Sequence, residues 1–414
     1  MRKLGEGATS EVFLCQDPFR NRQVAVKRIF PESLRDPSRG RLFRKLFFTE
    51  ASLAGKLDHP HIAQIYDAGI GEDSGYIVME YVPGGTMERF CAPDALLPVE
   101  QTVEIIFKCA RALAYAQKQG VTHRDIKPGN LLYAVAPTDV RIGDFGLALN
   151  VGQETTQITG VGSPAYMSPE QIREELVDHT TDLYSLGVVM YQMLSGKLPF
   201  QGTNKFSMIY QITQHEPPPP STHRREVPEV LDLIVRRAMH KDARHRYQSG
   251  DEFAEALMEA LKTGLARRNT FGDADKFAAL RAMEFFRRFS EPELWEVVRV
   301  GAWERVPAST EIVREGEAGE FFCVLVEGEA QVTKNRKLLT VLGPGECFGE
   351  MAYLAHDRRE RGATVTASKD SHIVRVRIED LERASVTCRS HFDRAFIGIL
   401  VDRLNLANTR LTSG

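Results

Sequence analysis

His123-Arg124-Asp125-Ile126-Lys127-Pro128-Gly129-Asn130 is the stretch around which the rest of this chain is organised. It sets an acid, a cation and a carboxamide at fixed intervals, and Asp144-Phe145-Gly146 follows after a short apolar run. A carboxylate can orient a hydroxyl, a lysine can steady phosphate charge, and two further oxygen ligands can hold a divalent cation. These residues therefore predict phosphoryl-transfer chemistry.

Length and composition indicate more than one globular unit. The chain has 414 residues, of which 43% are hydrophobic and 26% are charged, and such a chain can bury two or three cores. The net charge of -3 gives no reason to expect nucleic acid as a partner. Six scattered cysteines without a C-x-x-C pair are typical of reduced thiols.

Membrane and secretory signals are not found in the sequence. No apolar run approaches the ~18 residues needed to cross a bilayer. Residues 183–194 come nearest, but they include Tyr184, Ser185 and Gln192 and predict a buried helix. The first ten residues are polar and unlike a signal peptide. We therefore expect a cytoplasmic protein with no membrane partner.

The pattern along the first 262 residues predicts a small sheet lobe followed by a larger helical lobe. Residues 41–56 have helical periodicity, and the chain becomes mainly helical from residue 99. Four prolines at 217–220 predict either a rigid connection between helices or a ligand for a partner domain. The expected strands are residues 12–15, 23–29, 62–68 and 76–81.

The composition changes near residue 276. Residues 264–275 predict a linker or a helix start, and residues 277–289 an amphipathic helix dense in Phe. A second helix is expected at 293–300. Short apolar runs separated by glycines then predict an antiparallel barrel or roll, closed by helices at 379–385 and 391–410.

A glycine-rich loop at residues 5–12 lies between two expected strands. Glycines let backbone amides approach phosphate oxygens. A dinucleotide-binding fold would need a following helix and an acid about twenty residues later, but a strand follows and Lys27 stands there. No Gly-Lys-Ser/Thr occurs in the loop, so the Walker pattern also fails. Glu50 on the next expected helix offers Lys27 an anionic partner.

Taken in order, these motifs resemble the signature set of eukaryotic-like, bacterial-type Ser/Thr protein kinases. The resemblance covers residues 1 to about 262 and implies a bilobal fold with an N-lobe at 1–82 and a C-lobe at 83–262. Its Asp125-Ile126-Lys127 sequence is the Ser/Thr form. The matching positions are 5–12, Lys27, Glu50, 123–130, 144–146, 168–170 and 182–187.

The resemblance implies a role for each matched residue. Asp125 is expected to take the proton of the acceptor hydroxyl, and Lys127 to steady the transferring phosphoryl group. Lys27, paired with Glu50, is expected to hold the α- and β-phosphates. The expected metal ligands, for Mg²⁺ or Mn²⁺, are Asn130 and Asp144. The expected ATP-binding residues are Gly5, Gly7, Val12, Ala25, Lys27, the gatekeeper Met79, and Glu80 and Val82 of the hinge.

Arg124 immediately precedes the expected catalytic acid. In kinases with an arginine there, that cation usually needs a phosphorylated residue in the activation segment. The candidates are Thr155, Thr156 and Thr159, and the alternative is that they are ordinary loop threonines.

Three positions depart from the family pattern. Only four residues precede Gly5, so either the natural start lies upstream of Met1 or the lid over ATP is unusually loose. Ser10 replaces the third glycine, and Ser168 replaces the alanine of Ala-Pro-Glu. Neither substitution removes a catalytic group, so a pseudokinase scaffold is the less favoured alternative.

A second resemblance covers residues from about 277 to 388. The run 343–352 leads to an arginine at 361, and a carboxylate with a guanidinium suits a ribose phosphate. This run resembles the phosphate-binding cassette of cyclic-nucleotide-binding domains, which implies a β-roll with flanking helices. Glu350 would bind the 2′-hydroxyl and Arg361 the cyclic phosphate. The implied site is Gly349, Glu350, Ala352, Arg361 and Ala363.

The choice of ligand depends on small differences from that family. Gly362 lacks a hydroxyl, which gives no support for cyclic GMP and leaves cyclic AMP favoured. The span from Glu350 to Arg361 is about two residues longer than usual, and Glu360 stands where proline is common. Arg358 or Arg359 is therefore an alternative phosphate ligand, and a domain that keeps the fold without binding a nucleotide is another alternative.

We therefore expect a multidomain α+β protein with a kinase domain at 1–262, a linker at 263–276, a cyclic-nucleotide-binding-like domain at 277–388 and a C-terminal helix at 389–414. The expected activity is ATP-dependent phosphorylation of Ser and Thr in protein substrates, with a cyclic nucleotide as effector. In the alternative, the C-terminal domain is a docking or dimerisation module that supports a homodimer.

Overall fold

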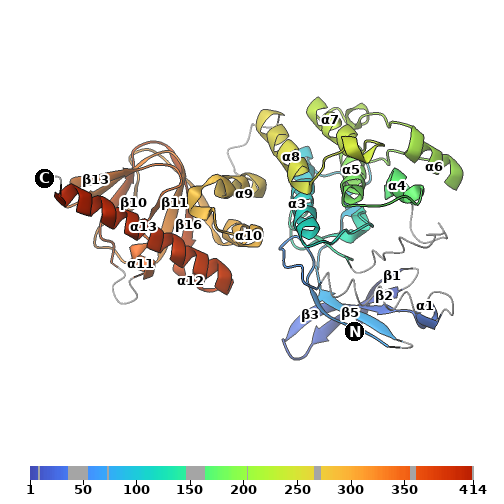
Figure 1. Cartoon of the computed structure of the whole chain (residues 1–414), viewed down its shortest axis with the longest axis horizontal. Helices are drawn as coiled ribbons and strands as arrows, with labels where there is room; N and C mark the ends of the chain where they lie inside the picture. Colours follow the sequence, from blue (N-terminus) through green and yellow to red (C-terminus); the bar gives the residue numbers. More distant parts are fainter. Residues whose placement is uncertain are drawn as a thin grey trace. The chain divides into compact units, whose positions relative to one another are not determined.

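A computed structural model describes residues 1–7, 10–35, 55–71, 74–145, 164–202, 204–264, 272–354 and 360–412. The chain divides into two compact units, Met1–Arg268 and Asn269–Gly414, which Figure 1 shows in blue to yellow and in gold to red. Among the residues that the structure describes, no helix is both long and apolar enough to cross a bilayer. Each unit has an apolar core of its own.

The first unit begins with an antiparallel sheet of five strands in the order β1-β2-β3-β5-β4. The predicted hairpin is confirmed by the pairing of β2 with β3, which turns through Asn21 at a φ of 48°. The helix predicted at 41–56 lies almost entirely outside the described residues. The elements are β1 (Arg2–Glu6), β2 (Ser10–Asp17), β3 (Arg22–Ile29), α1 (Pro31–Arg35), β4 (Ile65–Ile70) and β5 (Gly75–Glu80).

The rest of the first unit is mainly helical. The prediction of a buried helix at 183–194 is confirmed by α5, which packs against α3 and α7. The α5–α7 contact is close, since a Cβ on Gly187 would stand 2.8 Å from the Cβ of Ala238. The helices are α3 (Val99–Lys118), α4 (Pro169–Ile172), α5 (Thr180–Ser195), α6 (Lys205–Gln214), α7 (Glu229–Ala238) and α8 (Gly250–Gly264).

Short strands and 3-10 turns connect these helices. In a small sheet, β6-β7-β8, the loop at 123–130, which we call the catalytic loop for its expected role, precedes β7, and Asp144 follows β8. The proline run joins α6 to α7 through extended Pro219 and the buried Pro220. The elements are β6 (Gly85–Thr86), β7 (Leu131–Tyr133), β8 (Val140–Ile142), and 3-10 turns η1 (Met87–Phe90), η2 (Pro128–Asn130), η3 (Pro164–Tyr166), η4 (Pro220–Thr222) and η5 (Ala243–His245).

The second unit contains two four-stranded antiparallel sheets, which confirms the predicted roll. Their orders are β10-β15-β12-β13 and β14-β11-β16-β9. Residues from both sheets share one apolar core, including Val313 and Ala330 from the first and Leu325 and Ile373 from the second. The strands are β9 (Ala302–Val306), β10 (Glu311–Val313), β11 (Phe321–Glu327), β12 (Ala330–Lys334), β13 (Lys337–Leu342), β14 (Cys347–Phe348), β15 (Thr364–Ala367) and β16 (Ser371–Arg377).

Helices precede and follow this roll. The Phe-rich helix predicted at 277–289 is wrong in its bounds, because α9 ends at Ala282 and Met283 is extended. The following turn lets the ring of Phe289 pack 4.9 Å from that of Phe392, so ring packing overrides the helical period. The elements are α9 (Asp273–Ala282), η6 (Glu284–Phe286), α10 (Glu291–Val300), α11 (Met351–Leu354), α12 (Ile378–Glu382) and α13 (Val386–Thr412).

Candidate functional site

A buried acid at the start of α5 holds the catalytic loop in place. The Asp182 carboxylate accepts the backbone N–H of His123 at 2.7 Å and that of Arg124 at 2.6 Å. Arg124 has a φ of 65°, a conformation that a side chain disfavours, and the Gln171 amide also donates to its carbonyl at 2.9 Å. Burial raises the pKa of Asp182, against the effect of these donors. The loop is therefore fixed so that the next residue, Asp125, faces solvent.

Asp125 is the acid of the loop, and 52% of its side chain is exposed. One carboxylate oxygen, Oδ2, accepts Lys127 Nζ at 2.8 Å and Asn130 Nδ2 at 3.0 Å. The Asn130 amide also donates to the Asp125 carbonyl at 2.7 Å. The structure thus brings together the expected base, the expected phosphate-steadying lysine and one expected metal ligand.

Lys27 of β3 and Asp144, which follows β8, form a partly buried ion pair. The Lys27 Nζ lies 2.9 Å from Asp144 Oδ1. Burial acts to raise the pKa of Asp144, but the charges of Lys27, His123 and Lys127 outweigh it and lower this pKa below its ordinary value. Glu50, the expected partner of Lys27, lies outside the described residues. Asp144 is therefore an ionised acid facing the lysine of the sheet.

The donor atoms of Asn130 and Asp144 suit a hard divalent cation. The Asn130 Nδ2 is committed to Asp125, so its Oδ1 is the atom left for a metal. Mg²⁺ prefers oxygen ligands and usually takes one or two from the protein, with waters and phosphates completing the shell. Among the described residues no group of three or more His, Cys, Asp or Glu could hold a metal. The two side chains therefore fit a metal bound together with phosphates.

The expected ATP-binding residues of the sheet share one face. In the β-ladders Val12 lies opposite Lys27, and Ala25 lies opposite Met79. Ala25 and Lys27 are two residues apart on β3, so all four side chains point to the same side. Gly5 lies on β1 and Gly7 follows it, before the strands that form this face. Val82 is buried two residues after the end of β5. The Glu80 carboxylate is paired with Arg141 at 3.0 Å, and the Glu80 backbone N–H donates to the Gln64 carbonyl at 2.8 Å.

The activation segment is described only in part. Thr155, Thr156, Thr159 and Gly146 lie outside the described residues. The segment's end is held by a buried, bidentate ion pair in which Arg246 donates to Glu170 at 2.6 and 2.7 Å. Sequence reasoning missed Arg246, because it is one of several basic residues between α7 and α8 with no motif to distinguish it.

In the second unit, Arg361 is a buried cation at the end of a loop. Its guanidinium donates to the carbonyls of Gly349 at 3.1 Å and Phe321 at 2.7 Å. Burial lowers its pKa, and within the described residues no carboxylate forms an ion pair with it. Gly349 has a φ of 83°, and a Cβ there would stand 2.6 Å from Arg361 Nη1. A buried guanidinium bonded only to carbonyls suits an anionic ligand.

Glu350, the second expected ligand residue, is covered by the C-terminal helix. Only 2% of its side chain is exposed, and its Oε1 accepts Nη1 of Arg403 from α13. The amide of Ala352 donates to the Gly349 carbonyl at 3.3 Å, and Ala363 immediately precedes β15. Arg358 and Arg359 lie outside the described residues. Sequence reasoning missed Arg403, because no motif marks it among the polar residues of its helix.

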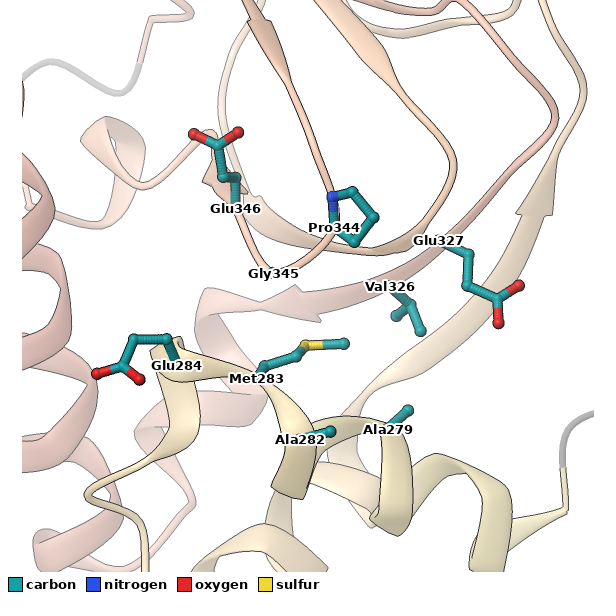
Figure 2. Close-up of a pocket in the computed structure, with 9 residues that line it drawn as sticks. All are labelled: Ala279, Ala282, Met283, Glu284, Val326, Glu327, Pro344, Gly345 and Glu346. Atoms are coloured by element: carbon teal, nitrogen blue, oxygen red, sulfur yellow. The ribbon is translucent and has the colours of Figure 1, made fainter.

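A separate pocket of about 500 Å³ lies in the same unit. Figure 2 shows Met283 and Val326 on facing sides of it, with Pro344 nearby. Three glutamates at 284, 327 and 346 line it, together with Ala279, Ala282 and Gly345. A cyclic phosphate would meet only negative charge here, so this pocket does not fit the nucleotide that Arg361 suits.

Comparison with protein families gives two matches. The protein kinase domain matches residues 1–260, and the cyclic nucleotide-binding domain matches residues 303–387. Serine/threonine-protein kinase PknB of Mycobacterium leprae is 39% identical over 262 residues, which are 62% of this chain and 41% of that protein. PknB of Mycolicibacterium smegmatis is 38% identical over 263 residues, with the same two coverages. The aligned part is thus well under half the length of these relatives.

Proposed function

The chain belongs to the protein kinase family, and from this premise we propose that it transfers the γ-phosphate of ATP to Ser or Thr hydroxyls of protein substrates. The observation that carries the proposal is the cluster of Asp125, Lys127 and Asn130, in which an exposed carboxylate is held by two donors. The ion pair of Lys27 and Asp144 offers a cation for the phosphates of ATP and a carboxylate for a metal ion, which supports the proposal further.

We propose a chemical task for each of these side chains. Asp125 accepts the proton of the incoming hydroxyl, and Lys127, already hydrogen-bonded to that carboxylate, donates to the phosphoryl oxygens. Lys27 holds the phosphates that remain on the nucleotide. Asn130 and Asp144 would hold a divalent cation, which would neutralise charge on those phosphates.

The test of this proposal is phosphate transfer by the full chain with ATP, Mg²⁺ and a protein substrate rich in Ser, Thr and Tyr. We expect phosphate on Ser and Thr but not on Tyr, identified by mass spectrometry. A chain that binds ATP yet transfers no phosphate would instead be a pseudokinase scaffold.

Activity is proposed to require phosphorylation of Thr155, Thr156 or Thr159. The support is Arg124, which immediately precedes Asp125 and whose backbone is held by hydrogen bonds with Asp182 and Gln171. Protein incubated with ATP should gain phosphate on this segment before it reaches full activity. An unmodified and fully active enzyme would contradict the proposal.

The C-terminal unit is proposed to bind a cyclic nucleotide, with cyclic AMP favoured, and so to regulate the kinase. Buried Arg361, bonded to carbonyls, supports binding of the cyclic phosphate, and Glu350 supports binding of the ribose. Calorimetry with cyclic AMP and cyclic GMP on the wild-type chain and Arg361→Ala tests it. Saturable binding that Arg361→Ala abolishes is expected, and no binding at millimolar concentration would overturn it.

The second candidate role for this unit is dimerisation without a nucleotide. It is favoured by α13, where Ile397, Val401 and Leu404 are exposed at intervals of four and three residues, as along a coiled-coil seam. Sedimentation of the full chain with and without cyclic AMP separates the two roles. A dimer that is unchanged by nucleotide, together with no calorimetric signal, would favour the docking module.

A further inference from the structure

The ring of Phe321, the first residue of β11, lies against two guanidiniums. The ring centroid is 4.4 Å from Cζ of Arg361 and 4.2 Å from Cζ of Arg375. Arg375 belongs to the neighbouring strand β16, where it pairs with Cys323, so its side chain and that of Phe321 point to the same face of the sheet. A guanidinium within about 6 Å of a ring centroid is attracted to the ring. One aromatic side chain therefore joins Arg361 to a second cation.

Phe321 holds Arg361 with its backbone as well as with its ring. The Phe321 carbonyl accepts Nη2 of Arg361 at 2.7 Å, while the Gly349 carbonyl accepts Nη1 at 3.1 Å. A guanidinium is planar and stacks on aromatic faces, whereas carbonyl acceptors restrain only its N–H groups. The ring therefore adds a restraint on Arg361 that the two hydrogen bonds do not supply.

Arg375 is held between Phe321 and a carboxylate of β9. Its Nη2 donates to Glu304 Oε2 at 2.9 Å, and its Nε is buried without a hydrogen-bond partner in the described part of the chain. The ring contact thus adds to this ion pair in placing the guanidinium. Burial lowers the pKa of Arg361, and the charge of Arg375 acts in the same direction. The two like charges are close enough to repel, and an anion on Arg361 would relieve that repulsion.

Ordering of Arg361 in advance has a consequence for phosphate binding. An arginine side chain has several rotatable bonds, and ordering them at the moment of binding reduces affinity. Arg361 is already held by the ring and by two carbonyls. An incoming phosphate would therefore meet donors that are oriented before it arrives.

We propose that Phe321 and Arg375 are positioning residues that orient Arg361 for the phosphate of an anionic ligand, Phe321 by direct contact and Arg375 through the ring. The inference rests on the nucleotide-binding role proposed above. It names two residues that set the affinity for a phosphate without contacting it.

The first test observes Arg361 in the full chain without ligand, by NMR of isotope-labelled arginine. Its Nε–H signal is identified by the loss of that signal in Arg361→Ala. The signal should be sharp in wild type and in Phe321→Tyr, which keeps the ring, and should broaden or disappear in Phe321→Leu and Arg375→Gln. The matched control is Arg305→Gln at an exposed arginine of β9 in the same sheet, which should leave the signal unchanged. A signal that stays sharp in Phe321→Leu would overturn the proposal, because the ring would then only fill space.

The second test measures binding of cyclic AMP by calorimetry in the same variants. Phe321→Leu should bind roughly tenfold more weakly than wild type and Arg375→Gln roughly threefold, while Phe321→Tyr and Arg305→Gln should match wild type. If denaturant unfolding shows that the second unit of Phe321→Leu does not fold, the comparison of Arg375→Gln with Arg305→Gln carries both tests.

The outcomes separate this proposal from the binding role. Saturable binding by the wild-type chain, with the same affinity in Phe321→Leu and Arg375→Gln, would overturn the positioning role and leave the binding role standing. No binding by the wild-type chain at millimolar concentration would overturn the binding role and this proposal with it.

Discussion

The catalytic loop and the cassette at 343–352 each contain a carboxylate paired with a cation, but the two carboxylates differ in exposure and in where their partners come from. Each has a carboxylate paired with a cation, Asp125 with Lys127 and Glu350 with Arg403. Asp125 is 52% exposed and its partner is two residues away, while Glu350 is 2% exposed and its partner comes from a distant helix. A pair formed within one loop is available to a substrate without rearrangement. A pair formed between distant elements joins the cassette to the C-terminal helix.

The residues that hold each segment in place, Asp182 and Arg361, also differ. The catalytic loop is fixed by Asp182, which is itself buried and bonded only to backbone amides of the loop. The cassette is fixed by Arg361, whose carbonyl partners are weaker than a phosphate would be. The Asp182 carboxylate already accepts the charge-assisted bonds that it can make in the loop, whereas an anionic ligand would be a better partner for Arg361 than its carbonyls are.

Loss of the exposed carboxylate should give the largest effect. Asp125→Asn is expected to lower kcat roughly a thousandfold, because a general base contributes about 10²- to 10⁴-fold. ATP binding and cyclic-nucleotide binding should not change. Steady-state phosphorylation and nucleotide titrations measure these quantities. The control is Asp94→Asn at an exposed acid outside the site, and an Asp125→Asn enzyme with more than about a tenth of wild-type activity would break the comparison.

Removing the buried cation below the activation segment should destabilise the first unit alone. Arg246→Ala leaves Glu170 as an unpaired buried charge and should cost about 3–5 kcal/mol of the free energy of unfolding. Denaturant unfolding should show the transition of the first unit shifted and that of the second unit unchanged.

Two controls define this effect. Arg244→Ala removes an exposed arginine two residues away and should leave the unfolding transition of the first unit close to that of wild type. Burial opposes ionisation of Glu170, but Arg246 lowers its pKa below the ordinary value. The stability from this pair should therefore be complete above the ordinary pKa of glutamate and lost as pH falls through the lowered pKa. An equal loss in Arg244→Ala would refute the assignment.

A substitution in the cassette should act on the second unit with a smaller effect. Gly349→Ala adds a Cβ at positive φ and close to Arg361, which should cost about 1–2 kcal/mol of unfolding free energy. It should also weaken cyclic-nucleotide binding, because Arg361 must shift. Gly362→Ala is the control, since its Cβ would meet nothing within 4 Å. Equal unfolding free energies of the second unit in the two variants would contradict the claim that Gly349 is needed for the close approach of Arg361.

The smallest effect is expected where α13 meets the cassette. Tyr353→Phe removes the hydroxyl that donates to Asp393 and should cost about 1 kcal/mol in the second unit. Faster hydrogen exchange near residue 393, with kinase activity unchanged in the absence of nucleotide, is the expected result. Tyr210→Phe, at an exposed tyrosine of α6, should have no such effect. Unchanged exchange in Tyr353→Phe would mean that this bond does not hold the helix.

The sequence predicted the parts that depend on short, contiguous motifs. The loop from His123 to Asn130 and the hairpin of β2 and β3 were visible because each is formed by neighbouring residues. The predicted bounds of the Phe-rich helix were wrong, since contact with Phe392 decides where α9 ends. Arg246 and Arg403 were missed, because their partners lie far away in the sequence and an arginine alone gives no local signal.

The most direct test of the contrast is one calorimetric comparison of the wild-type full chain with Arg361→Ala, titrated separately with a non-hydrolysable ATP analogue plus Mg²⁺ and with cyclic AMP. Affinity for the ATP analogue should be equal in the two proteins, while saturable binding of cyclic AMP should be lost in the variant, because the carbonyl-bonded guanidinium is removed. Equal affinities for cyclic AMP, or a parallel change for both ligands, would contradict the claim that Arg361 holds the cyclic phosphate.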